Sequence, residues 1–155
     1  MLRAVLDTNV FVSGLLSKTD LPAKILEAWR DGQYVLIRSP PLVAEIKRAL
    51  ETARIREKYF ITDGDIEQLI ILLEKDALVV PGHTDVKNAI PGDPSDEMFL
   101  ACAVDASADF IVSGDRHLLD ISEYKDIPII TVSKVPRASA RGTLLRISRN
   151  AYDLK

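Results

Sequence analysis

The chain has 155 residues, of which 47% are hydrophobic and 28% charged, and its formal net charge is −3. This length fits one domain with its own core, and the composition excludes the collagen-like, disordered and low-complexity classes. A single cysteine, Cys102, excludes an internal disulfide and a cysteine-based zinc site. Because there is no apolar run of membrane-spanning length and no signal-like start, we expect a cytoplasmic protein without a membrane segment.

The charges are unevenly distributed along the chain. From Lys134 onward there are six basic residues and one acid, whereas residues 1–133 have 14 basic residues and 22 acids, so the two parts carry +5 and −8. A body this acidic does not bind nucleic acid through its overall charge. It is compatible with an acidic pocket that a metal ion neutralises, or with a local basic arm; a solvated tail is the alternative for the basic end.

Strand and helix patterns alternate along the chain. Ser39-Pro40 marks the start of one helix, and Thr62 to Asp65 marks the start of another. Strands are predicted at residues 2–6, 34–37, 77–80, 110–112 and 127–132. Helices are predicted at 21–29, from 40 past 50, at 62–75 and at 95–106, with a loop at 81–94. Strands separated by helices predict a single α/β domain with a mainly parallel sheet that helices flank on both faces.

Two acids directly follow buried-type strands. Asp7 lies between two apolar runs, and Asp115 follows the strand at 110–112 through Ser113-Gly114. The carboxyl ends of parallel strands form the edge at which α/β proteins bind ligands. The sequence therefore predicts two carboxylates at this edge of the sheet.

Further acids stand near the starts of helices that follow strands. Asp93 and Asp96 precede the helix at 95–106 or lie in its first turn, and Glu45 lies inside the helix that starts at Pro40. Each has a structural alternative: Asp93 and Asp96 fit a helix cap, Glu45 can pair with Arg48, and Asp115 can cap a short helical turn at His117. These alternatives explain each acid singly, but not their recurrence at one sheet edge.

Converging carboxylates repel one another unless a cation is present, and oxygen ligands suit Mg²⁺ or Mn²⁺. This chemistry indicates a metal-dependent reaction at a phosphodiester or phosphoryl group. A dehalogenase-type phosphatase needs a second acid where this chain has Asn9. A receiver domain needs a phospho-accepting aspartate after a middle strand, whereas the strand at 34–37 is followed by Arg38-Ser39. The chain has neither a P-loop motif nor a serine-hydrolase elbow.

Four blocks of the sequence together resemble the PIN-domain family, small metal-dependent ribonucleases that include the VapC-type toxins. The resemblance covers residues 2 to about 132, in the strand and helix context that the motifs require. The blocks are LDTNV at 6–10, SPPLVAE at 39–45, DPSDEMFLA at 93–101 and ADFIVSGDRHLL at 108–119.

The resemblance implies a PIN-like three-layer sandwich over residues 1–135, with 136–155 as a basic C-terminal extension of the same domain. It implies an endoribonuclease that uses Mg²⁺ or Mn²⁺ and leaves 5′-phosphate and 3′-hydroxyl ends. It also implies a homodimer and, for a toxin, a cognate antitoxin as partner. An RNA-processing nuclease without an antitoxin, or a noncatalytic RNA- or protein-binding module, remains an alternative. The implied acidic site consists of Asp7, Glu45, Asp96 and Asp115, with Asp93 as a fifth member and Asn9 and Ser113 orienting ligands or water.

Overall fold

The computed structural model of the chain describes residues 1–16, 20–86 and 97–135. Its strands are β1 Arg3–Leu6, β2 Val35–Arg38, β3 Ala77–Val79, β4 Phe110–Val112, β5 Glu123–Tyr124 and β6 Ile127–Ile130. Its helices are α1 Thr8–Leu16, α2 Leu21–Arg30, α3 Pro40–Glu51, α4 Ala53–Tyr59, α5 Asp63–Lys75, α6 Glu97–Asp105 and α7 Arg116–Ile121, followed by the short 3₁₀ helix η2 Val132–Lys134. No helix among the described residues is long and apolar enough to cross a membrane.

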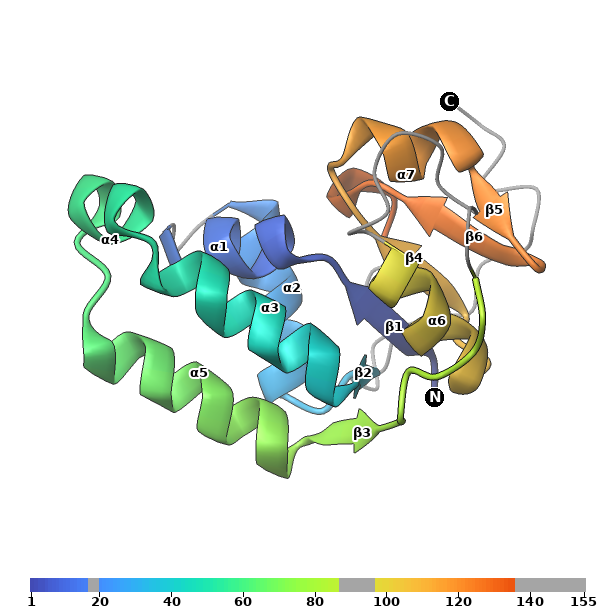
Figure 1. Cartoon of the computed structure of the whole chain (residues 1–155), viewed down its shortest axis with the longest axis horizontal. Coiled ribbons are helices and arrows are strands. Elements are labelled where there is room, and N and C mark those ends of the chain that lie inside the picture. Colours follow the sequence, from blue (N-terminus) through green and yellow to red (C-terminus); the bar gives the residue numbers. More distant parts are fainter. Residues whose placement is uncertain (17–19, 87–96, 136–155) are drawn as a thin grey trace.

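The strands form one sheet in the order β3-β2-β1-β4-β6-β5 (Figure 1). All neighbouring pairs are parallel except β5 and β6, which form an antiparallel hairpin. The predicted α/β class with a mainly parallel sheet flanked by helices is therefore confirmed. The strand order reverses direction between β1 and β4, and this switch point is where open α/β sheets leave a crevice for a ligand.

The core lies around the central strands. In β1, Ala4, Val5 and Leu6 are buried, and every residue of β4 is buried. Helix α6 packs across β1, β2 and β4, while α3 lies beside α5, as Figure 1 shows. Strands that are covered on both faces need continuous apolar sequence, which is the pattern that predicted them.

Helix starts follow the predicted capping signals. The Ser39 hydroxyl accepts the Leu42 N–H at 3.3 Å, so Ser39 caps α3. At α5, Thr62 accepts the Asp65 N–H at 3.1 Å while the Asp65 carboxylate accepts the Thr62 N–H at 3.0 Å. This reciprocal pair is a capping box, and it fixes the start of the helix that the sequence placed at the same point.

Some elements differ from the sequence prediction. The helix that starts at Pro40 ends at Glu51, and α4 follows it as a separate helix after Thr52. The last strand ends at Ile130, and Thr131 occupies the N-cap position of the 3₁₀ helix η2 instead of continuing the sheet. The helix predicted at 95–106 is described only from Glu97, and most of the loop predicted at 81–94 lies outside the described residues. The hairpin partner β5 has only two residues, too few to give a period in the sequence.

Two glycines give a matched test of the packing between α1 and α2. A Cβ on Gly14 would lie 2.4 Å from Leu26 Cδ1 and 3.1 Å from the Pro22 carbonyl oxygen, whereas a Cβ on Gly64 would meet nothing closer than 3.7 Å. We expect Gly14→Ala to destabilise the protein by about 1–3 kcal/mol because the buried Leu26 must move. We expect Gly64→Ala in α5 to stabilise it by about 0.4–1 kcal/mol. Urea denaturation measures both, and equal effects of the two variants would contradict the close α1–α2 contact.

Candidate active site

Asp7 stands at the carboxyl end of β1, at the switch point of the sheet. Its backbone N–H donates to the Val112 carbonyl at 3.0 Å, so the pairing of β1 with β4 reaches Asp7 itself. Its side chain is 3% exposed, and its Oδ1 accepts the Val10 N–H at 3.1 Å at the start of α1. The buried carboxylate thus caps a helix N-terminus, where the helix dipole favours negative charge.

Burial dominates the ionisation of Asp7. Loss of solvent raises its pKa above the ordinary value of 3.8. Hydrogen bonds from Ser113 and from the backbone N–H groups of Val10, Gly114 and Asn9 lower the pKa but do not cancel the effect of burial. Within the part of the chain that the structure describes, no positive side chain is among the contacts of this carboxylate, and a bound cation would supply the compensating charge.

Ser113 connects Asp7 to the segment that follows β4. Its fully buried hydroxyl donates to Asp7 Oδ2 and accepts the Asp115 N–H at 2.9 Å. Its own N–H donates to the Ile130 carbonyl at 2.9 Å, which fixes the residue against β6. Ser113 therefore fixes the position of Asp7 relative to Asp115, although the two acids are far apart in the sequence.

Asp115 both caps a helix and lines the site. Its Oδ1 accepts the N–H groups of His117 at 2.8 Å and Leu118 at 3.3 Å, which makes Asp115 the N-cap of α7. The structural alternative from the sequence is thus correct for this oxygen. It does not exclude a second role, because Asp115 also faces the cavity described below.

Glu45 reaches the same region from α3. Its side chain is 27% exposed and accepts a hydrogen bond from Arg48 Nε at 2.9 Å and a second from Arg48 Nη2. The Arg48 side chain is 66% exposed, so this forked ion pair lies at the rim and contributes little to stability. The pairing of Glu45 with Arg48 that the sequence left open is present, and both side chains line the cavity.

The three described acids meet at one cavity of about 200 Å³. Asp7 arrives from the end of β1, Glu45 from α3, and Asp115 from the segment after β4, so residues far apart in sequence become neighbours. The sequence also predicted Asn9 here, but it gave no signal for Thr8, Ala49 or Phe99. All the lining residues are Asp7, Thr8, Asn9, Glu45, Arg48, Ala49, Phe99 and Asp115.

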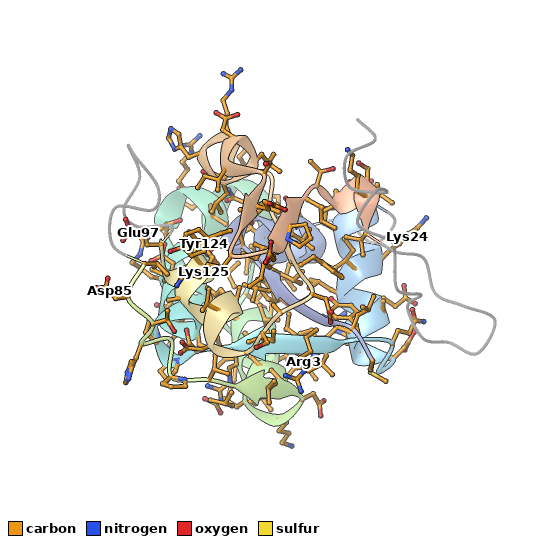
Figure 2. The ribbon with its side chains drawn as sticks, turned by 90° about the vertical axis from the view of Figure 1, so that its right-hand side faces the viewer. Arg3, Lys24, Asp85, Glu97, Tyr124 and Lys125 are labelled. Carbon is orange, nitrogen blue, oxygen red and sulfur yellow. The ribbon has the colours of Figure 1, made fainter. Side chains whose placement is uncertain are left out.

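Asp93 and Asp96, the other two predicted acids, lie outside the described residues. The segment before them is bound to α6, because the Asp105 carboxylate accepts the N–H groups of His83 at 3.0 Å and Thr84 at 3.2 Å. The chain on the other side continues directly into α6 at Glu97. Figure 2 shows Asp85 and Glu97 on the same side of the molecule.

The donor chemistry of the cavity fits a hard divalent cation. Its ionisable ligands are carboxylates, with neither histidine nor cysteine in the lining. Thr8 Oγ1 is buried there and has no hydrogen-bond partner within the described part of the chain. Among the same residues, no three acidic, histidine or cysteine side chains are grouped as a ready-made metal site. A complete ligand set therefore needs a further donor, and Glu45 has to release Arg48 to join it.

Residues of other catalytic classes lie elsewhere. Cys102 is buried in α6, and burial raises the pKa of its thiol to about 12, so it is no nucleophile at neutral pH. His117 lies on the exposed surface of α7, as expected for a residue at a helix start. Arg3, labelled in Figure 2, lies at the end of β1 opposite to Asp7, and its guanidinium donates to the Ala106 carbonyl at 3.0 Å.

A mainly parallel sheet with carboxylates at its switch point defines an α/β protein with an acidic site. A family model described as PIN domain matches residues 3–117. The chain therefore belongs to the PIN-domain family, and the resemblance drawn from the sequence motifs is confirmed.

The chain is also similar to individual proteins. The chain is 27% identical over 137 residues to the uncharacterized protein MJ1680 of Methanocaldococcus jannaschii, covering 87% of this chain and 86% of that protein. It resembles a chain of VapBC2 from Rickettsia felis, crystallised with a DNA fragment from their promoter, with a TM-score of 0.56 and 12% identity. It also resembles a chain of FitAcB from Neisseria gonorrhoeae, with a TM-score of 0.50 and 16% identity. In both structures the likeness covers 84% of this chain and 98% of the other, and it shows the fold.

The buried charge of Asp7 predicts a gain in stability when it is removed. Because its pKa is raised above 3.8, the folded state binds the proton more tightly than the unfolded state. The stability gained from this tighter proton binding is fully present below pH 3.8 and is lost as the pH rises through the folded-state pKa of Asp7. In EDTA at neutral pH, we expect Asp7→Asn to be more stable than the wild type by about 0.5–2 kcal/mol.

Thermal unfolding of both proteins across pH measures this difference, which should shrink as the pH falls toward 3.8. The exposed Asp120 on α7 provides the control, and Asp120→Asn should leave the curve unchanged. A neutral-pH destabilisation by Asp7→Asn would contradict the stated cost of burying this carboxylate.

Proposed function

We propose that the chain is a divalent-metal-dependent endoribonuclease whose acidic site is this cavity. The observation that carries the proposal is the convergence of Asp7, Glu45 and Asp115 on one cavity at the switch point of a PIN-family fold. Three carboxylates at one place are costly for a purely structural site. They suit an ion held against a phosphate.

The acids that would hold the ion are Asp7, Asp96 and Asp115, with Glu45 at the rim as the fourth acid and Asp93 as the fifth. Either Mg²⁺ or Mn²⁺ suits an all-oxygen set. When bound, such an ion supplies positive charge against the negative charge that develops on the scissile phosphate and its leaving oxygen. We assign the 5′-phosphate and 3′-hydroxyl ends that the family resemblance implies to the products.

The chain's own groups prepare this chemistry. Ser113 fixes the rotamer of Asp7, so that one carboxylate is positioned before any ligand arrives. Glu45 lies at the rim, where it can serve a second ion or accept a proton from the attacking water. Once Arg48 leaves Glu45, its guanidinium can donate to a phosphate oxygen. Asn9, which is exposed at the cavity, can orient water.

Cleavage of RNA tests the proposal directly. We expect the wild type to cleave single-stranded RNA in Mn²⁺ or Mg²⁺ and to stop when EDTA is added. Asp7→Asn and Asp115→Asn should each lower the rate by about 10²-fold or more, because each removes a ligand charge with little change in shape. Gel analysis of end-labelled RNA measures both the rates and the chemistry of the product ends.

The matched control for cleavage is Asp120→Asn, which removes one exposed charge of the same helix that Asp115 caps. It should cleave RNA as the wild type does. Full activity of both site variants, or of the wild type in excess EDTA, would refute the nuclease assignment and favour a noncatalytic binding module.

We further propose that the nuclease is the toxin of a toxin–antitoxin pair and acts on RNA in the cytoplasm. The support is the fold shared with chains of VapBC2 and FitAcB, whose identity to this chain is only 12% and 16%. The partner would be a cognate antitoxin that covers the acidic cavity. The homodimer expected from the family resemblance belongs to the same proposal.

Growth of a host cell distinguishes a toxin from a processing nuclease. We expect expression of the wild type to arrest growth and expression of Asp7→Asn to have no effect, because only the former degrades RNA. Co-expression of a small protein encoded beside this chain should restore growth. Active RNA cleavage in vitro without growth arrest would instead indicate an RNA-processing nuclease without an antitoxin.

A further inference from the structure

An aromatic side chain is held in solvent in a backbone conformation that few residues adopt. Phe60 ends α4 with φ 55° and ψ 37°, in the left-handed region, and it is 86% exposed. Glycine or asparagine usually occupies this position at a helix end, because a bulky side chain is strained there. Neither the backbone strain nor the exposed ring benefits the fold. An outlier of this kind points to a function for the ring.

The ring stands in the most basic stretch of an acidic body. Residues 47–60 contain five basic residues and two acids, whereas the rest of residues 1–133 contains nine basic residues and 20 acids. Arg54 and Lys58 are exposed on α4. Arg56 has a different role, since its guanidinium lies 2.6 Å from the Asp63 carboxylate and joins α4 to the start of α5. The ion pair thereby closes the turn that presents Phe60.

This basic stretch is continuous with the acidic cavity. Arg48 lines the cavity from the last turn of α3, and α4 begins directly after the helix ends at Glu51. Figure 1 shows α4 beyond that end of α3, on the side toward which β1 points. A single-stranded nucleic acid that reaches the cavity along α3 would therefore pass the surface of α4.

We propose that Phe60, with Arg54 and Lys58, binds single-stranded RNA next to the acidic cavity; this inference rests on the proposed ribonuclease function. A base stacks on the Phe60 ring, and the two cations contact phosphates on either side of that base. Every base has a face that stacks on an aromatic ring, so the site holds RNA without reading its sequence. A single ring among cations suits a nucleic acid better than a protein, which would require a wider apolar surface.

Binding is measured apart from cleavage, by fluorescence anisotropy of a short unstructured RNA in EDTA and low salt. Phe60→Ala should weaken binding by about 5-fold to 150-fold, the range for one stacked base. Phe60→Trp should bind as tightly as the wild type or more tightly. The control is Val79→Ala, which shortens a 50% exposed apolar side chain on β3 and should leave binding unchanged.

A structural role for Phe60 is tested with Phe60→Asn, because asparagine tolerates the left-handed conformation without an aromatic ring. We expect an equal or higher unfolding temperature together with weakened RNA binding. Loss of folding stability in this variant would show that the ring supports the fold, and it would overturn the assignment.

The cations are tested through the salt dependence of binding. Arg54→Gln and Lys58→Gln should each reduce the slope of log affinity against log salt by about 0.7, the value for one phosphate contact of a single strand. Lys75→Gln removes an exposed charge at the far end of α5 and should leave the slope unchanged.

The outcomes separate this inference from the proposed function. If the wild type cleaves RNA while all α4 variants bind it normally, the α4 site is wrong and the nuclease stands. If RNA binding depends on Phe60 and the cations but cleavage is absent, the nuclease is wrong and the site stands. Unchanged RNA affinity combined with a Phe60→Ala shift in sedimentation from dimer to monomer would assign the surface to a second copy of the chain.

Discussion

The hydrogen bond from Ser113 to the buried carboxylate of Asp7 is the contact on which the rest of the site depends. It joins the end of β1 to the segment after β4, across the one place where the strand order of the sheet reverses. The same hydroxyl accepts the N–H of Asp115, so two acids over a hundred residues apart share one anchor. The sheet pairing on both sides holds this anchor rigid, and preorganised ligands cost no reorganisation when an ion or substrate binds.

The site sets function against stability. Burial raises the pKa of Asp7, and no cation among the described contacts of that carboxylate compensates its charge. The fold tolerates this charge because α1 begins directly after Asp7, at Thr8, and the Val10 N–H in its first turn donates to the carboxylate. The charge of Glu45 is compensated differently, because Glu45 lies at the rim and forms an ion pair with the exposed Arg48. A bound cation would compensate the charges of Asp7 and Glu45, and an anionic substrate would take the place of Glu45 as the partner of Arg48.

The α4 region repeats this pattern at the surface. Phe60 keeps an exposed ring in a strained conformation, and the Arg56–Asp63 ion pair closes the turn that holds it. A protein with net acidic charge meets RNA only where cations are concentrated, and within residues 1–133 they are concentrated between Lys47 and Phe60. The RNA-binding surface that we propose on α4 therefore directly follows α3, which brings Glu45 and Arg48 to the rim of the cavity.

The sequence by itself determined the α/β class, the capping residues Ser39 and Thr62, and the acids at strand ends, because these follow from local periodicity and helix-end chemistry. It left the role of Asp115 open between helix cap and site residue, and only the tertiary structure showed that one side chain does the first while facing the cavity. The break at Thr52, the exposed Phe60 and the contribution of Thr8 and Phe99 to the cavity were not predicted. Thr8 and Phe99 reach the cavity because α1 and α6 both pack against α3, and such packing joins residues that no local pattern connects.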